Sequence, residues 1–342
     1  MFKLQQGNLN AFMATLSSGR TVYALSQVDL QYHLVRAEAW DGDQHLLGSY
    51  RPVEPLKGLF FPPRETVGRL REDSPLPEMR ERIVIGVKNC DLSALKIHDY
   101  VFLECEPRDP FYAQAREKTV IISCDCTDAR ESCFCPAVDE QPYARAGFDI
   151  NLSPIGDGFI VEPGSEKGEA LLDRAGDMLS PVSQDDLSKR DANRYAVTRR
   201  VAEQAEGRGL TTGADLQAAV RASEDADMWD VFARDCVECG ACNFVCCTCH
   251  CFLLADGSSP AGGDSRVKKW DSCLYHNFAR VAGGANPRKH RADRLFNRFD
   301  KKFVFFPEVL GRYACDGCGR CAEACTGKID IRDVLKKALD GQ

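Results

Sequence analysis

The chain has 342 residues, of which 44% are hydrophobic and 28% charged, and its formal net charge is −7. This composition is that of a globular protein long enough for two domains, and the acidic excess argues against a dedicated nucleic-acid-binding protein. No apolar run reaches the roughly 18 residues that span a bilayer, and MFKLQQGNLNAFMATL at the N-terminus lacks the features of a secretory signal, so we expect a cytoplasmic protein.

In the N-terminal half, two buried strands with a helix between them are predicted. RIVIGVKNC (residues 82–90) has the pattern of a strand ending at a cysteine, and KTVIISC (residues 118–124) that of a second strand. The intervening DLSALKIHDYVF has helical spacing, with Asp91 as its candidate N-cap. This order predicts an α/β domain over residues 1–164, to which GDGFIVEPG adds a hairpin strand.

Five cysteines lie at the predicted ends of these strands or shortly after the second one. They are Cys90, Cys124, Cys126, Cys133 and Cys135. In a βαβ unit the ends of adjacent parallel strands meet at one sheet edge, where ligands usually bind, so four of these thiols could meet there as metal ligands. A group of buried free thiols is the alternative. If the second strand continues to Cys126, Cys124 and Cys126 share one face, so geometry alone does not choose between them.

The remainder of the chain divides into two further parts. Residues 165–226 have a helical pattern, in GEALLDRAGDML and ANRYAVTRRVAEQA, and are predicted to connect the other two. Residues 227–342 are rich in loops and cysteine, so this small domain needs a source of stability other than its apolar core. Within it we expect an exposed loop over residues 255–266, a basic helix over residues 288–302 and a terminal helix in KIDIRDVLKKALD. A basic run of this kind usually forms a solvated face; it could also dock a partner or lie over an anionic cluster.

Eighteen cysteines are the most unusual feature of the composition. A disulfide framework is not expected in a reducing compartment. Instead of being scattered, four cysteines lie within residues 124–135, seven within residues 236–251 and four within residues 315–325. Such clustering indicates metal binding. Cys105, which has no cysteine neighbour, is expected in the core.

The spacing C-x2-C-x2-C-x3-C occurs twice, and a glycine (Gly240, Gly319) follows the second cysteine of each copy. Glycine permits φ > 0 and a close backbone approach at that position. In two-cluster ferredoxins the fourth cysteine of each motif binds the other cluster. The repeat therefore predicts two [4Fe–4S] clusters in a ferredoxin-like domain, one on Cys236, Cys239, Cys242 and Cys325, the other on Cys315, Cys318, Cys321 and Cys246.

Three points of this assignment have alternatives. Structural zinc also uses C-x2-C pairs, although it needs no third cysteine at the same step. Proline usually follows the fourth cysteine of the motif, whereas this chain has Cys247 and Thr326 there, so Cys247 could replace Cys246 as a ligand. The surplus thiols either line the cluster pocket as apolar groups or hold another metal. They are Cys247, Cys249, Cys251 and Cys273.

Motifs for substrate or nucleotide binding are missing from the sequence. It contains neither G-x-G-x-x-G nor G-x4-G-K-[ST], so no flavin, NAD or nucleotide fingerprint is present. Cluster ligands without such motifs favour a subunit that relays electrons. The alternatives are an enzyme with a catalytic metal centre built on the surplus thiols, which turnover by the isolated chain would reveal, and an iron–sulfur redox sensor.

Six segments in order resemble one known family. They are GVKNCDLSALKIHDYVFL, SCFC, CVECGACNFVCCTCHC, KKWDSC, AGGANPR and CDGCGRCAEAC. This set, from about Arg82 to the C-terminus, resembles the beta subunit of sulfhydrogenases and equally the iron–sulfur electron-transfer subunit of anaerobic sulfite reductase. Similar subunits accompany flavin oxidoreductases linked to heterodisulfide reductase.

The resemblance has implications for function and for the N-terminal cysteines. It implies an electron-transfer subunit of anaerobic metabolism, working between a flavin- and NAD(P)-binding partner and a catalytic subunit, with no nucleic acid and no membrane insertion. It further implies a third [4Fe–4S] cluster on Cys90, Cys126, Cys133 and Cys135, which match family cysteines. We prefer Cys126 to Cys124 on this ground, because Cys124 extends a buried apolar strand. Cys249, Cys251 and Cys273 match family positions as well.

Overall fold

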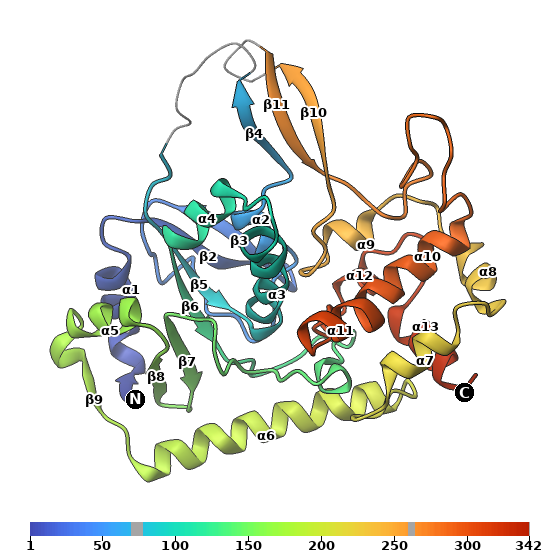
Figure 1. Ribbon diagram of the computed structural model, residues 1–342. Helices are drawn as coiled ribbons and strands as arrows, with labels where there is room; N and C mark the ends of the chain where they lie inside the picture. The colour runs from blue at the N-terminus through green and yellow to red at the C-terminus, as the bar shows by residue number, and fades with distance from the viewer. Residues whose placement is uncertain (70–77, 259–263, 342) are drawn as a thin grey trace.

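An eight-stranded mixed sheet forms the N-terminal part of the structure, a computed structural model that describes residues 1–69, 78–258 and 264–341 (Figure 1). The strand order is β3-β2-β5-β6-β7-β8-β1-β9. The four parallel strands are β2 (Thr21–Val28), β5 (Arg82–Val87), β6 (Thr119–Cys124) and β7 (Ile150–Pro154). The strands that pair antiparallel at the two sides are β3 (Gln31–Ala37), β8 (Gly158–Pro163), β1 (Phe2–Gln5) and β9 (Leu179–Pro181). The predicted α/β arrangement and the β8 hairpin are therefore confirmed.

Both faces of the sheet centre are covered, which explains why the sequences of β5 and β6 are almost continuously apolar. All six residues of each strand are buried. Phe12 and Met13 of α1 (Leu9–Ser17) pack on one face with α5 (Glu166–Asp173). Leu92 of α3 (Asn89–Asp99) and Tyr112 of α4 (Pro110–Glu117) pack on the other. Short elements in this part are η1 (Gln6–Asn8), α2 (Lys57–Phe60), η2 (Tyr100–Glu104), η3 (Cys135–Val138) and η4 (Gly176–Met178).

The start of α3 differs from the sequence prediction. The strand ends at Val87, and Cys90 lies in the first turn of the helix instead of at a strand end. Asp91 is not the N-cap, a position held by Lys88 without a side-chain hydrogen bond. The Asp91 carboxylate does not cap the helix because it is buried and forms an ion pair at 2.7 Å with the buried guanidinium of Arg320. An unpaired arginine at such a position would be costly.

The C-terminal part is a group of short helices around its own apolar core. Trp229 packs against Phe296 and Phe299 with ring centroids 5.2 and 5.3 Å apart, and the terminal helix adds Val334 and Leu335. Figure 1 shows the long helix α6 (Gln184–Glu206) running from the sheet to these helices. They are α7 (Leu216–Ala222), α8 (Met228–Ala233), α9 (Ala241–Phe244), α10 (Arg291–Asp300), η5 (Lys301–Phe305), α11 (Phe306–Leu310), α12 (Arg320–Glu323) and α13 (Ile331–Leu339).

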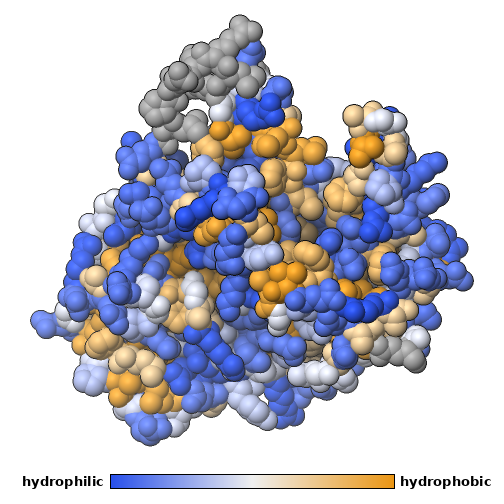
Figure 2. Space-filling view, viewed as in Figure 1, coloured by the Kyte–Doolittle hydropathy of each residue, from blue (hydrophilic) through white to orange (hydrophobic). Residues whose placement is uncertain are grey.

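A small antiparallel sheet links the two parts. It consists of β10 (Phe252–Ser258), β11 (Asp264–Trp270) and β4 (Arg64–Arg69), the last contributed by the N-terminal part. The loop predicted over residues 255–266 is therefore wrong at its two ends, which are strands; residues 259–263 lie outside the described residues. Leu253 and Leu254 are more than half exposed, and Figure 2 shows apolar side chains gathered over this hairpin. None of the described helices has the length and apolar character needed to cross a bilayer.

Candidate metal centres

The eighteen cysteines are all free thiols. Three cavities are each lined by cysteines from more than one segment of the chain. We call them the motif cavity, the sheet-edge cavity and the surplus-thiol cavity. A fourth group of thiols, from the second copy of the repeat and Cys246, lies between the first two.

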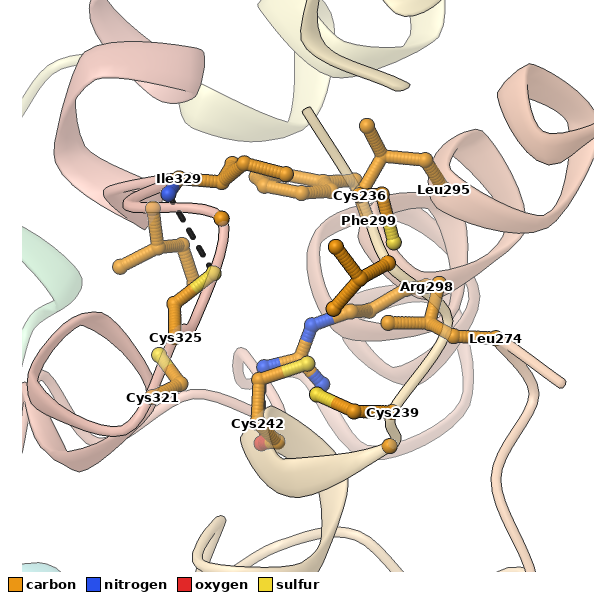
Figure 3. A pocket seen from close by; sticks show the side chains of 14 residues that line it. Cys236, Cys239, Cys242, Leu274, Leu295, Arg298, Phe299, Cys321, Cys325 and Ile329 are labelled. Carbon is orange, nitrogen blue, oxygen red and sulfur yellow. Dashed lines mark hydrogen bonds between the residues drawn. The ribbon is translucent and has the colours of Figure 1, made fainter. Parts of the chain in front are cut away.

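The motif cavity, of about 40 Å³, contains one complete set of predicted ligands (Figure 3). Cys236, Cys239, Cys242 and Cys325 all line it, and Cys321 from the second set forms part of its wall. Figure 3 shows the guanidinium of Arg298 reaching in between the thiols, with Leu274, Leu295 and Phe299 around them. The backbone N–H of Ile329 donates a hydrogen bond to Cys325 Sγ at 3.3 Å.

The two copies of the repeat have the same local backbone. Gly240 and Gly319 adopt φ of +73° and +71°, and each stands immediately before a single-turn helix, α9 or α12. This left-handed conformation explains why glycine follows the second cysteine in both copies. The first copy is nearer the surface, since Cys239 is the one exposed thiol among the eighteen.

The second set of predicted ligands is also brought together. Electrostatic interactions link Cys246 to Cys315, Cys318 and Cys321, all of which are strongly desolvated. Cys247 lies close by, with its Sγ 3.8 Å from Cys318 Sγ. Cys246 and Cys247 are therefore both close enough to be the fourth ligand of this set, and the structure does not choose between them.

The sheet-edge cavity, of about 30 Å³, is lined by Cys90, Cys126, Cys133 and Cys135. These are the four thiols predicted for a third cluster. Burial raises the pKa of the Cys126 thiol to about 12, so this thiol stays protonated at neutral pH unless a metal binds it. Cys124 does not line the cavity, because its side chain packs in the apolar core of the sheet.

The sheet-edge cavity and the second motif share a wall. Cys318 lines the cavity, and the N–H of Phe134 donates to the carbonyl of Gly317 at 2.8 Å. A Cβ on Gly317 would lie 2.4 Å from the backbone of Cys135, so the two segments approach as closely as glycine allows. The ion pair between Asp91 and Arg320 lies at the same junction, one residue from Cys90 in sequence.

Three buried cations lie among the thiols without a carboxylate partner in the described part of the chain. Lys302 Nζ is 3.2 Å from Cys246 Sγ, Arg298 Nη1 is 3.4 Å from Cys249 Sγ, and Lys57 Nζ donates to the carbonyl of Cys249 at 2.9 Å. Burial alone would lower the pKa of Lys302, but thiolate charge at Cys246 and Cys249 raises it overall. Such cations need a compensating anion, which thiolates bound to a metal group would provide.

These cations could be found only in part from sequence. The solvated face expected for residues 288–302 is wrong for Arg294, Arg298 and Lys302, which are all buried. Their spacing of four residues puts them on one face of α10 and η5, and Arg294 pairs with Glu238. No sequence signal marks Lys57, which approaches from a helix nearly two hundred residues earlier.

The surplus cysteines do not share one location. Cys249, Cys251 and Cys273 line the surplus-thiol cavity, whereas Cys247 lies beside Cys318 of the second set. Cys105, expected in the core, is instead partly exposed at the end of η2.

The chemistry of the donor atoms at these sites fits an iron–sulfur group better than it fits a single metal ion. Each site offers soft thiol donors, beside buried cations that suit an anionic group. Within residues 1–69, 78–258 and 264–341, no three His, Cys, Asp or Glu side chains are arranged to hold one metal ion. A [4Fe–4S] cluster has a different requirement, because its four cysteines bind four separate irons.

Comparison with known proteins agrees with the sequence resemblance. The family model described as a 4Fe-4S dicluster domain matches residues 235–329, which contain both copies of the repeat. Sulfhydrogenase 2 subunit beta of Pyrococcus furiosus is 31% identical over 301 residues, covering 87% of this chain and 87% of that protein. No solved structure matches the chain.

Proposed function

The chain belongs to the family of sulfhydrogenase beta subunits, and on this premise we propose that it relays electrons between a flavin- and NAD(P)-binding subunit and a catalytic subunit. An iron–sulfur electron-transfer role follows from the family and its dicluster domain. The hydrogenase-type complex and its flavoprotein are our proposal. The observation that carries the proposal is the contiguity of the predicted ligand sets.

We assign three [4Fe–4S] clusters to these sets. The first is bound by Cys236, Cys239, Cys242 and Cys325, the second by Cys315, Cys318, Cys321 and Cys246, the third by Cys90, Cys126, Cys133 and Cys135. Support for the first and third comes from their convergence on one cavity each, and for the second from the mutual interactions of its thiols. A bound [4Fe–4S] cluster would supply one-electron redox chemistry.

The protein would bind these groups in series. Cys318 of the second set also lines the sheet-edge cavity, and Cys321 of the same set also lines the motif cavity. The second set is thus adjacent to both others. The series would begin beside the carboxyl ends of β5 and β6 and end near the surface at Cys239.

The buried cations have a defined part in this function. Arg298 and Lys302 would balance the negative charge of thiolates and make adding an electron more favourable, because a cation stabilises the more negative, reduced state. The apolar walls, including Leu295 and Phe299, would keep water from the thiols. Hydrogen bonds to the sulfurs, such as that from Ile329, tune the potential in the same direction.

We keep the division into residues 1–164, 165–226 and 227–342 as a proposal about domains. The sheet and the C-terminal helices have distinct apolar cores, which supports the two outer parts, while Phe134 of the first part and Leu216 of the second pack into the C-terminal core. The pairing of β4 with β11 and the junction at Gly317 cross these boundaries, so the parts would not move independently.

Anaerobic purification of the tagged full-length chain from its native host tests the function. We expect a flavoprotein and a catalytic subunit to co-purify, and EPR of the reduced complex to show interacting [4Fe–4S] signals. Matching iron and acid-labile sulfide contents should accompany them. Zinc with negligible sulfide, or a solitary chain that turns over a substrate with only its own cofactors, would overturn the proposal.

A further inference from the structure

The surplus-thiol cavity is not used by the three assigned clusters. Its volume is about 180 Å³, against about 40 and 30 Å³ for the motif and sheet-edge cavities. Three thiols (Cys249, Cys251 and Cys273), the imidazole of His250 and two buried cations line it. A space of this size with such a lining calls for an occupant that binds sulfur and carries negative charge.

We propose that this cavity holds a further iron–sulfur cluster, bound by the thiolates of Cys249, Cys251 and Cys273 and by the imidazole of His250. The inference rests on the proposed function, because it adds one redox centre to the same electron-transfer path. It assigns a ligand role to residues that would otherwise only fill space around the repeat.

A rigid element holds two of the donors together. Cys251 directly precedes β10, and Cys273 follows β11. Phe252 pairs with Trp270 across the hairpin, and the N–H of Asp271 donates to the carbonyl of Cys251 at 2.9 Å. The base of the hairpin therefore places both thiols in the lining of the same cavity.

His250 has the hydrogen bond that metal-binding histidines usually make. Its Nδ1 lies 3.1 Å from the carbonyl oxygen of Thr248, which can only accept, so Nδ1 carries the proton. In the neutral ring Nε2 then keeps its lone pair. Imidazole is a known ligand of cluster iron, since two histidines replace two cysteines on one iron of Rieske [2Fe–2S] centres.

The charges around the cavity favour a cluster over zinc. Arg298 and Lys302, each 5% exposed, line it without a carboxylate partner in the described ranges. The side-chain amide of Asn297, 8% exposed, also lines it. Two buried cations and an amide donor would stabilise a thiolate-bound cluster, which is anionic, and would oppose the approach of a bare dication.

The position of the cavity suits electron transfer. The amide nitrogen of Asn243 lies 3.1 Å from Cys273 Sγ, and its oxygen lies 3.8 Å from Cys242 Sγ, a predicted ligand in the motif cavity. The oxygen also accepts from Arg298 at 2.6 Å. One side chain thus joins a donor of the new site to a donor of an assigned one.

Metal analysis of the full-length chain tests the inference. After anaerobic saturation with iron and sulfide, we expect about sixteen irons and as many sulfides per chain, four for each of four clusters. Cys251→Ser and Cys273→Ser should each lose about four of both and keep the EPR signals of the other clusters. Cys105→Ser is the matched control and should keep the wild-type content, because Cys105 lines none of the three cavities.

The outcomes separate this inference from the proposed function. About twelve irons in the wild type, with no loss in Cys251→Ser or Cys273→Ser, would overturn the inference and leave the three-cluster assignment intact. Loss of zinc instead of iron and sulfide would overturn it as well. If a variant does not fold, the wild-type stoichiometry decides alone. His250→Cys should keep the iron and lower the midpoint potential, whereas an unchanged potential would remove His250 from the ligand set.

Discussion

The motif cavity and the sheet-edge cavity each contain one predicted set of four ligand cysteines beside a fifth cysteine from the second set, yet they are built in opposite ways. Three thiols of the motif cavity come from seven consecutive residues, Cys236 to Cys242, whose local backbone brings them together. The thiols of the sheet-edge cavity come from a helix start, a strand extension and a separate loop. A motif can therefore set one site almost alone, whereas the other depends on the assembled fold.

This difference leads to a clear expectation about mutations. Changes at the junction between the N-terminal part and the second motif should empty the sheet-edge cavity before they affect the motif cavity.

Exchange of single cysteines should have the largest effect. Cys126→Ser removes a thiol from the sheet-edge cavity, so iron should fall by about four atoms per chain. Cys124→Ser is the matched control: it lies two residues away and packs in the sheet core, so it should cost stability and keep all the iron. Iron and sulfide analysis with EPR checks both variants. Iron loss in Cys124→Ser alone would reverse the assignment of this ligand.

Sequence and structure contribute differently to these two sites. The repeat predicts the first two ligand sets because their spacing is local, and it predicts positive φ at Gly240 and Gly319 correctly. The gathering of Cys90 and Cys126 can be predicted only from βαβ topology and family resemblance. Cys318 in the wall of the sheet-edge cavity could not be predicted, because that contact joins residues almost two hundred positions apart.

The burial of the basic side chains in residues 288–302 likewise cannot be predicted from the sequence. The pattern of residues 288–302 predicts a helix, which is confirmed, but amphipathic basic helices are mostly solvated. Only the packed thiols and the aromatic core around Phe299 show that Arg298 faces inward. The hairpin β10–β11 escapes prediction for a related reason: its Gly- and Ser-rich sequence has turn character, while pairing with β4 stabilises the strands.

The buried ion pair at the junction should have the next largest effect. Asp91→Ala leaves the Arg320 guanidinium buried and unpaired, which should reduce the free energy of unfolding by about 3 to 5 kcal/mol. Iron from the sheet-edge cavity should be lost first. Replacing both residues by apolar ones, Asp91→Leu with Arg320→Met, should recover most of the stability. Urea unfolding monitored by fluorescence measures both, and equal stability of the single variant and wild type would contradict the ion-pair argument.

The close approach at Gly317 predicts a smaller loss. A Cβ there meets the backbone of Cys135 at 2.4 Å in a residue with φ of +62°, so Gly317→Ala should cost about 3 kcal/mol. Gly284→Ala is the matched control, since Gly284 has φ of +84° with no atom within 4 Å of the added Cβ, and it should cost about 1 kcal/mol. The comparison isolates the steric contact from backbone strain. Similar losses in the two variants would mean that the junction can relax.

The smallest effect is expected at the start of α6, which connects the two regions. Ser183 and Asp186 form a capping box, and Lys3 Nζ bonds to the Asp186 carboxylate at 2.8 Å. Ser183→Ala should cost about 1 kcal/mol and keep all the iron, because Val201, which packs beside the sheet-edge cavity, lies several turns further along the helix. Urea unfolding measures the loss of stability, and iron analysis measures the cluster content. A loss of iron would contradict this prediction.

Asp186 also gives this region a pH dependence. Hydrogen bonds from Lys3 and Ser183 lower the pKa of its carboxyl group, so ionised Asp186 stabilises the folded state above the pKa of the unfolded chain, near pH 4. This contribution is lost as the pH falls through the lower pKa of the folded state. The destabilisation by Asp186→Asn should therefore be constant between about pH 7 and 5 and shrink below about pH 4. Urea unfolding of both proteins at several pH values measures it, and a difference that grows on acidification would contradict the assigned sign.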